Sequence, residues 1–166
     1  DGGPRPYVPA EHDLPQGLEL AVMRQESNFD PTIVSGAHAV GLMQLRPATG
    51  EELARRTHQS FGTITAATLT NPQVNMTLGA AYLQQLMERF GGSVPYLLAA
   101  YNSGPHRVDT WLASLGDPAR DHASGEVVLD WIESIPFEET RNYVERVVEN
   151  MAIYQARATT GQEAAR

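Results

Sequence analysis

Glu26 is the residue of this sequence that is best placed to act as a proton donor. Apolar residues recur before it at helical spacing, which predicts an amphipathic helix over Leu14–Ser27. Glu26 follows Val22 by one turn, so its carboxylate falls at the margin of the apolar face. Partial desolvation raises the pKa of a carboxyl group and fits it to donate a proton near neutral pH. The alternative is an ordinary glutamate at the surface end of a helix.

A loop should follow this helix, because Asn28 favours turns and Pro31 keeps Asp30 out of the helical region. The chain then reaches Gly41-Leu42-Met43-Gln44, in which an apolar pair precedes an amide side chain. Such an amide can hydrogen-bond a sugar hydroxyl or acetamido group. The apolar pair can equally belong to the core.

Four ordered blocks resemble the catalytic domain of soluble lytic transglycosylases. They are Gln25–Ser27 with Phe29 and Pro31, Gly41–Gln44 with Pro47, Ala100–Gly104 with Val108 and Trp111, and Glu133–Phe137 with Glu139–Val144. The resemblance runs from about Gly17 to Arg157, and four blocks at compatible spacing are more specific than any one alone. It implies a mainly α fold of the lysozyme-like α+β type: a single compact helical domain with a central buried helix and a substrate cleft.

The resemblance also implies a reaction. The enzyme would cleave the β-1,4 bond between N-acetylmuramic acid and N-acetylglucosamine in peptidoglycan. Glu26 would protonate the glycosidic oxygen and then, as a carboxylate, take the proton from the C6 hydroxyl of the same muramoyl ring. A 1,6-anhydro ether would close without water, helped by the high effective concentration of a nucleophile within the substrate. A hydrolytic muramidase, with Asp30 or Glu133 as a second carboxylate, and an inactive peptidoglycan-binding module are the alternatives.

Six further residues are assigned to substrate binding by the resemblance. They are Ser35, Met43, Gln44, Tyr101, Asn102 and Glu133. Ser35 and Gln44 would hydrogen-bond near the reacting sugar, and Glu133 would help to order the groove. Tyr101 and Asn102 would point into the cleft from the end of a buried helix, although a polar pair there can also be a simple cap.

Four of the residues near the reaction have equally ordinary interpretations. Met43 and Tyr101, with Phe137, would keep water away from the reacting sugar, or they are plain core residues. Glu133 is otherwise an exposed glutamate before a proline turn. Position 38 departs from the resemblance because it carries His38 where the family usually has glycine, and a left-handed backbone there would be strained. Arg46 replaces the usual methionine and would alter that edge of the cleft.

The composition narrows the classes of protein. The chain has 166 residues, of which 42% are hydrophobic and 19% charged, as expected of one globular domain. Its net charge of −8 argues against nucleic acid as a partner. Cysteine is absent and the five histidines are scattered, so neither a metal nor another cofactor is predicted. No membrane-spanning run occurs, and we expect a mature or excised domain from the bacterial periplasm or envelope. The predicted partner is the glycan strand of peptidoglycan. An upstream helical region and envelope proteins are further candidate partners.

The remaining elements follow from capping and breaker residues. Residues 1–13 are predicted to be an extended lead-in, 14–157 the catalytic domain and 158–166 a frayed tail. Residues 58–70 and 117–126 are expected to be loops, and 127–132 a short helix or strand. Predicted helices cover Pro47–Thr57, a segment that opens at Asn71-Pro72 and closes at Gly91-Gly92, the buried Ser93–Ser103, Pro105–Leu115 and Glu138–Arg157.

Overall fold

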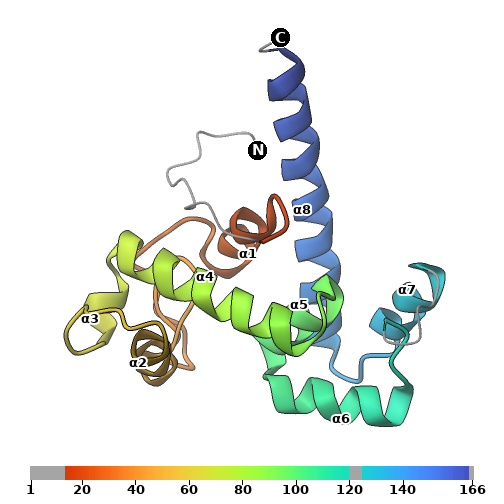
Figure 1. Cartoon of the computed structure of the whole chain (residues 1–166), viewed down its shortest axis with the longest axis horizontal. Helices are drawn as coiled ribbons and strands as arrows, with labels where there is room; N and C mark the ends of the chain where they lie inside the picture. Colours follow the sequence, from red (N-terminus) through yellow and green to blue (C-terminus); the bar gives the residue numbers. More distant parts are fainter. Residues whose placement is uncertain (1–13, 120–124, 165–166) are drawn as a thin grey trace. The chain divides into compact units, whose positions relative to one another are not determined.

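The computed structural model describes residues 14–119 and 125–164, and these are helices and loops (Figure 1). Within those ranges the β-structure consists of two isolated bridges, Val34 to Val40 and Val40 to Leu45. The predicted mainly α class is therefore confirmed. The chain divides into two compact units, Asp1–Tyr82 and Leu83–Arg166, and the boundary lies inside a helix. The predicted lead-in, residues 1–13, lies outside the described residues.

The first unit contains three helices and the beginning of a fourth. These are α1 (Leu18–Ser27), α2 (Pro47–Arg56), α3 (Ala66–Leu69) and the first part of α4 (Pro72–Arg89). α1 starts later than predicted, because Gly17 has a left-handed backbone with φ +82°. α3 interrupts a segment predicted to be a loop, where the Thr65 and Thr68 side chains form a reciprocal capping box.

The core of the first unit lies around α2, α3 and α4. Seven buried apolar residues form this cluster: Val40, Leu45, Leu53, Ala54, Ile64, Leu69 and Leu78. Burial of each larger aliphatic side chain contributes roughly 1.5–3 kcal/mol relative to exposure. Val40 and Leu45 belong to the loop between α1 and α2, so this loop is fixed to the core.

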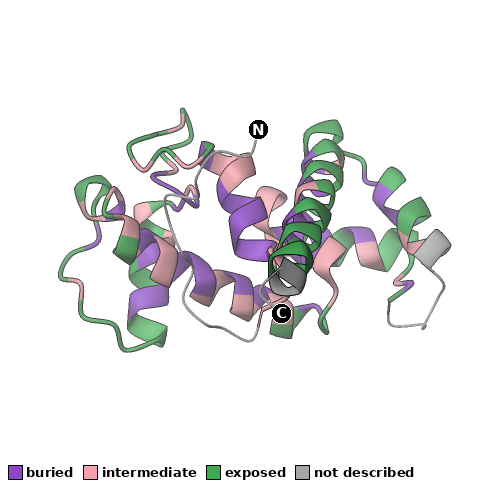
Figure 2. Cartoon of the chain, turned by 90° about the horizontal axis from the view of Figure 1, so that it is seen from above, coloured by how far each residue is buried: buried purple, intermediate pink, exposed green. Residues whose placement is uncertain are grey.

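The second unit is built around α5 (Val94–Ser103), which is buried from Tyr96 to Ala100 as predicted. α5 packs against α6 (Pro105–Leu115) and α8 (Glu138–Ala164), and α7 (Gly125–Glu133) packs against α8. The segment 127–132, for which either a short helix or a short strand was predicted, is thus helical. In Figure 2 exposed residues cover much of the surface of α8.

The last helix differs from the prediction at its C-terminal end. α8 continues to Ala164, whereas a frayed tail is expected from Ala158. Thr159 and Thr160 donate their hydroxyls to the carbonyls of Gln155 and Ala156, at 3.1 and 3.0 Å. Since these hydroxyls bond within the helix, they do not compete with it.

Tyr96 anchors the segment that follows α6. Its hydroxyl donates to Asp117 Oδ1 at 2.9 Å and accepts from the backbone N–H of Ala119 at 3.0 Å. Its ring lies against that of Trp131 on α7, with 4.7 Å between the ring centroids. Of the predicted polar loop 117–126, residues 120–124 lie outside the described residues, and Gly125 and Glu126 begin α7 instead of belonging to a loop.

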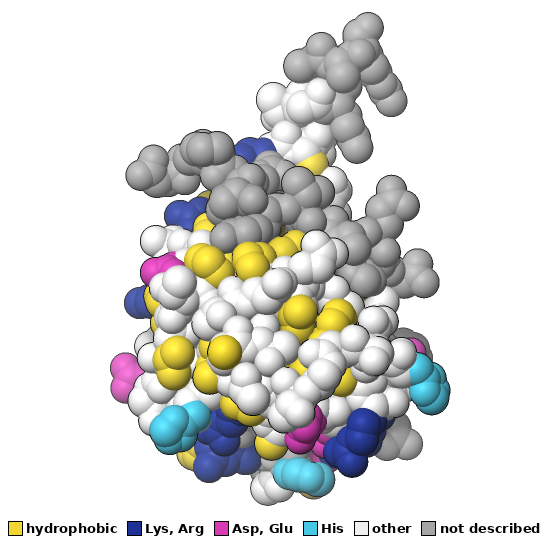
Figure 3. Space-filling view, turned by 90° about the vertical axis from the view of Figure 1, so that its left-hand side faces the viewer, with side chains coloured by type: hydrophobic (Ala, Val, Ile, Leu, Met, Phe, Trp, Pro, Cys, Tyr) yellow, Lys and Arg dark blue, Asp and Glu magenta, His cyan; other side chains and the backbone are white. Residues whose placement is uncertain are grey.

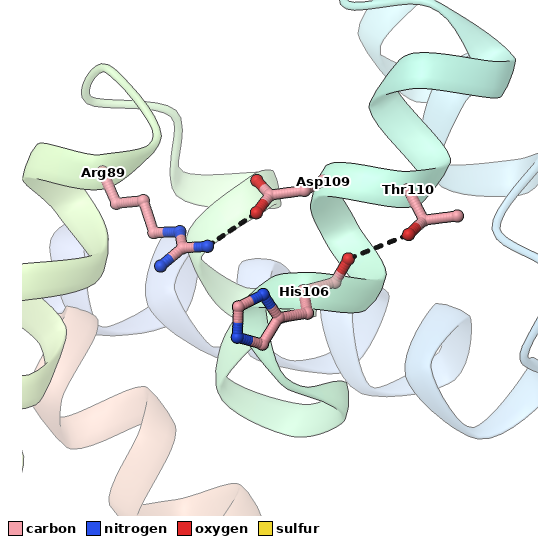
Figure 4. Close-up of polar contacts among 4 residues, drawn as sticks. All are labelled: Arg89, His106, Asp109 and Thr110. Atoms are coloured by element: carbon pink, nitrogen blue, oxygen red, sulfur yellow. Dashed lines mark hydrogen bonds and ion pairs between the residues drawn. The ribbon is translucent and has the colours of Figure 1, made fainter.

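A surface ion pair joins the end of α4 to α6. Arg89 Nη2 lies 2.6 Å from Asp109 Oδ2, and within α6 the hydroxyl of Thr110 donates to the carbonyl of His106 at 3.1 Å (Figure 4). Both partners of the ion pair are exposed, so the pair adds little to stability. In the view of Figure 3 charged side chains lie mostly toward the rim, and hydrophobic and uncharged groups cover the middle.

Candidate functional site

Glu26 lies in the last turn of α1, where it is half-buried. The face of α1 that precedes it is in the core, with Leu18, Val22 and Met23 fully buried. Asn28 then ends the helix with a left-handed backbone, φ +50°. The predicted position of Glu26 at the margin of an apolar face is therefore confirmed.

Ser27 connects the end of α1 to the Gly41–Gln44 loop. Its hydroxyl donates to the carbonyl oxygen of Leu42 at 2.8 Å and lies 3.1 Å from the carbonyl of Met23. Ser27 is buried, so water does not compete for these bonds. The residue directly after Glu26 thus holds the middle of the loop.

Asn75 of α4 also holds the Gly41–Gln44 loop. It lies after the loop in the sequence, whereas Ser27 lies before it. Its Oδ1 accepts from the N–H of Met43 at 2.8 Å, and its Nδ2 donates to the carbonyls of Val40 at 2.8 Å and Leu69 at 2.9 Å. The side chain is fully buried. Asn75 therefore brackets Gly41 and Leu42 with bonds to the residues on either side.

Two glycines allow the loop to approach α4 closely. Gly41 has φ +80°, and a Cβ there would collide with the side chain of Asn75. A Cβ on Gly79 of α4 would collide with the sulfur of Met43. Met43 is itself completely buried, so the structure places it in the core, where it supports the loop.

Gln44 is half-buried and has a strained backbone, with φ +52°. Its Nε2 donates to the carbonyls of Gly41 at 2.9 Å and Ile33 at 3.1 Å. Because the protein uses the amide nitrogen, a sugar group bound by Gln44 would have to donate to Oε1. A non-glycine residue with positive φ costs free energy and is often found at functional sites.

Ser35 organises the loop before Gly41. Its Oγ accepts from the N–H groups of Ala37 and Ala39, at 3.2 and 3.1 Å, and its own hydroxyl proton can still be donated. His38 in this turn is exposed and has φ +64°, so the left-handed backbone considered for this position is present. Bridges from Val40 to Val34 and to Leu45 join the Ser35 turn and the Gln44 turn into one structure.

The other predicted site residues belong to the second unit. Tyr101 and Asn102 are half-buried in the last turn of α5, and Glu133 is exposed at the end of α7. Asn102 Oδ1 accepts a hydrogen bond from Thr140 of α8 at 2.8 Å. The candidate residues thus form two groups, one in each unit.

Phe137 is exposed over 41% of its surface, so it is not a core residue. The guanidinium of Arg107 lies over its ring at 4.6 Å from the centroid, and Trp111 meets the ring edge to face at 5.4 Å. These contacts hold an aromatic side chain at the surface between α7 and α8.

Two carboxyl groups of the first unit have shifted pKa values. Burial raises the pKa of Glu19, two turns before Glu26 on α1, to about 7. Its Oε2 has no hydrogen-bond partner among the described residues. The side-chain and backbone hydrogen bonds from Thr32 lower the pKa of Asp30. Asp30, which with Glu133 is one of the two candidates for the second carboxylate of a hydrolase, is thus held as an exposed, ionised carboxylate.

Residues 14–119 and 125–164 contain no group of three or more histidine and acidic side chains that could hold a metal ion. Within the same ranges, every helix is too short or too polar to span a bilayer.

Asn75, Thr140 and Glu19 are buried polar residues that were not predicted to belong to the site. Asn75 carries a usable signal: it is a polar residue beside Val74 and before Leu78 in a helix whose apolar face is otherwise regular. A buried asparagine needs partners, and these are backbone groups that only the folded chain brings near.

Comparisons with known proteins match almost the whole chain. The model of the transglycosylase SLT domain matches residues 10–123, and that of the soluble lytic transglycosylase helical domain matches residues 134–163. The soluble lytic murein transglycosylase of Escherichia coli K12 is 37% identical over 147 residues, which are 86% of this chain and 21% of that protein. A putative soluble lytic murein transglycosylase of Haemophilus influenzae is 38% identical over 144 residues, 86% of this chain and 23% of that protein.

Solved structures agree with these sequence matches. The 70 kDa soluble lytic transglycosylase of Escherichia coli superposes with a TM-score of 0.76 at 35% identity, over 87% of this chain and 22% of that one. It is also known in complex with bulgecin A. An inactive mutant of lytic transglycosylase Slt from Pseudomonas aeruginosa, with glutamine in place of a glutamate, superposes with a TM-score of 0.73 at 39% identity, over 86% of this chain and 22% of that one. This chain spans about a fifth of the length of these relatives, and it belongs to the family of transglycosylase SLT domains.

Proposed function

We propose that this domain is a lytic transglycosylase that cleaves the β-1,4 bond between N-acetylmuramic acid and N-acetylglucosamine in peptidoglycan and leaves a 1,6-anhydromuramoyl end. The observation that carries the proposal is the position of Glu26, which is half-buried at the end of α1 and followed by a serine bonded to the Gly41–Gln44 loop. Family membership and the names of the relatives support the same activity. The inactive glutamate-to-glutamine mutant of the Pseudomonas aeruginosa protein supports an essential glutamate.

Glu26 acts first as an acid. Its carboxyl group protonates the oxygen between the two sugars, and the bond from C1 of the muramoyl residue to that oxygen breaks with both electrons leaving on the oxygen. The substrate's own acetamido group stabilises the positive charge at C1. This step requires the carboxyl group of Glu26 to carry its proton when the substrate binds.

The same carboxylate acts next as a base. It accepts the proton of the C6 hydroxyl while that oxygen bonds to C1, which closes the 1,6-anhydro ring and returns Glu26 to its starting state. No water is consumed, and the proton balance closes on one residue. One acid is therefore sufficient, in contrast to the paired carboxylates of most glycosidases.

The remaining candidate residues bind the strand in this proposal. Gln44 accepts from a sugar hydroxyl through Oε1, and Ser35 donates its hydroxyl proton. In the second unit Tyr101, Asn102 and Glu133 make the corresponding contacts from α5 and α7. Met43 supports the loop from the core instead of touching the sugar, as its complete burial indicates.

We further propose that residues 14–157 are the catalytic part of a longer envelope protein that acts in the bacterial periplasm. The match covers 21% of the length of the Escherichia coli relative, which supports a longer protein. The match of residues 134–163, most of α8, to the helical domain model supports the same proposal. The partner is peptidoglycan, and the regions outside this domain would supply any contacts with other envelope proteins.

Digestion of purified sacculi tests the activity. Parent protein should release muropeptides that lack a reducing end and are one water lighter than hydrolysis products, as seen by mass spectrometry. Glu26→Gln should release none while keeping the parent's melting temperature, because the carboxamide fills nearly the same space. Reducing-end products would instead identify a muramidase, and equal release by the parent and the Glu26→Gln variant would refute the role of Glu26.

A further inference from the structure

A buried hydroxyl on α8 fixes the side-chain amide of Asn102. Thr140 lies in the first turn of α8, is 2% exposed and donates its hydroxyl to Asn102 Oδ1 at 2.8 Å. Asn102 is half-buried at the end of α5, the central helix of the second unit. A hydroxyl in a buried position keeps its protein partner, since water is not available as a substitute.

This bond decides which atom of the amide faces away from Thr140. A threonine hydroxyl has one proton, and here it is given to Oδ1, so the Nδ2 group of Asn102 is turned away from Thr140. Nδ2 makes no hydrogen bond to the residues that the structure describes, 14–119 and 125–164. Asn102 is half-buried, and its amide has two N–H groups to donate to a ligand.

Asn102 and Thr140 lie at helix ends that are held by hydrogen bonds. The N–H of Gly104 donates to the carbonyl of Ala100 at 2.8 Å, and Ser103 bonds back to Ala99 at 2.7 Å, so the last turn of α5 is closed. On α8, the N–H and guanidinium of Arg141 donate to the carbonyls of Phe137 and Ile135, at 2.9 and 3.1 Å. A donor held between two ordered helix ends loses little entropy on binding.

We propose that Thr140 is a positioning residue that fixes Asn102 as a donor to an acceptor-only oxygen of the glycan, such as the carbonyl of an N-acetyl group. This inference rests on the proposed function, because it takes the glycan strand as ligand. It assigns a polarity to the contact: Asn102 gives hydrogen bonds and does not accept them. Sugar hydroxyls, which both give and accept, do not require such an arrangement.

Thr140→Val and Thr140→Ser form the matched pair that tests it. Valine keeps the shape and removes the hydroxyl, whereas serine keeps the hydroxyl. Two readouts are measured for each: product release from sacculi, as kcat and KM, and cosedimentation of the inactive Glu26→Gln form with insoluble sacculi. Thr140→Val should lower kcat/KM and binding about fivefold to tenfold, the value of one hydrogen bond. Thr140→Ser should stay within about twofold of the parent.

Asn102 variants separate positioning from general stability. In an Asn102→Ala background Thr140→Val should cause no further loss of kcat/KM, because the residue through which it acts is gone. Asn102→Asp keeps an acceptor for Thr140 but replaces both N–H donors with an oxygen, so it should bind sacculi as weakly as Asn102→Ala. Melting temperatures of all variants are measured alongside.

The outcomes distinguish this inference from the proposed function. If the parent releases no product, and Thr140→Val weakens sacculus binding whereas Thr140→Ser does not, the inference stands and the proposed activity is refuted. If the parent is active but Val and Ser at position 140 behave alike, or the two losses add in the double variant, the positioning role is overturned. Full binding by Asn102→Asp overturns the donor polarity, and a parent that does not bind sacculi overturns both proposals.

Discussion

Ser27 Oγ lies 2.8 Å from the carbonyl oxygen of Leu42, and this bond ties the residue after Glu26 to the middle of the Gly41–Gln44 loop. The two segments are far apart in sequence and contribute the acid and the amide of the candidate site. Asn75 holds the same loop through Met43 and Val40. Two buried polar side chains, Ser27 and Asn75, therefore hold the loop that carries Gln44, one of the residues proposed to bind the substrate.

Ser27→Ala should reduce product release about tenfold or more, because the loop is no longer fixed to α1. It should also lower the free energy of unfolding by about 1–3 kcal/mol, since the carbonyl of Leu42 loses its partner in a buried place. Ser114→Ala is the control: that exposed serine also donates to the carbonyl four residues earlier but has no remote acceptor. Urea denaturation and sacculus digestion measure both effects, and equal behaviour of the two variants would contradict the role of Ser27.

Asn75→Ala should destabilise the protein by about 3–5 kcal/mol, because it removes three buried hydrogen bonds, those to the N–H of Met43 and to the carbonyls of Val40 and Leu69. Asn71→Ala is the matched control. Asn71 is exposed and only accepts from the N–H of Val74 at the start of α4, so its loss should cost about 1 kcal/mol. Equilibrium unfolding compares the two. A small and equal loss would mean that the loop does not depend on Asn75.

Gly79→Ala should destabilise the protein by about 1–3 kcal/mol, because the new methyl group collides with the sulfur of buried Met43. In contrast, Gly161→Ala on α8 has no atom within 4 Å of its new Cβ and should stabilise by about 0.5–1 kcal/mol. Adding Met43→Ala should remove most of the penalty at position 79, as measured by a double-mutant cycle. If Gly79→Ala still destabilises the protein in the Met43→Ala background, the loss of stability has a cause other than the contact with Met43.

His38→Gly should raise the free energy of unfolding by about 0.5–1 kcal/mol, because glycine adopts the left-handed backbone at φ +64° without strain. His38→Ala removes the same side chain but keeps the strain, so it should bring no gain. Thermal unfolding of the three proteins measures the difference. Equal stability of the alanine and glycine variants would show that the backbone at this position is not strained.

Stability should fall as the pH rises from about 5 to 8, because of Glu19. Burial raises its pKa to about 7 from 4.5, so over this range the unfolded state binds fewer protons at this residue than the folded state. The contribution to stability is complete below pH 4.5 and is lost as the pH passes 7, by about 3 kcal/mol in all. Glu19→Gln should abolish this loss in denaturation curves at pH 5 and pH 8. Glu51→Gln, an exposed change on α2, should keep the parent's pH dependence, and the same dependence in Glu19→Gln would contradict the assignment.

The helical class, many helix ends and the place of Glu26 could be predicted from the order of residues alone. Helix starts such as Pro72 and Pro105 and stops such as Gly104 and Gly116 act through local backbone geometry, which neighbouring residues specify. The position of Glu26 beside an apolar face follows from helical periodicity alone. The short helix α3 was not predicted, because it has only four residues and so shows no apolar periodicity. Its capping box of Thr65 and Thr68 was the only signal near it.

The polar side chains that hold the candidate site together could not be predicted without the folded chain. Asn75 and Thr140 bond to groups 32 and 38 residues away in sequence, and Ser27 reaches 15 residues ahead. The fold likewise moved Met43 into the core, left Phe137 at the surface and buried Glu19. These outcomes depend on which elements pack together and on how much water they exclude, and neither is encoded in the local spacing of residues.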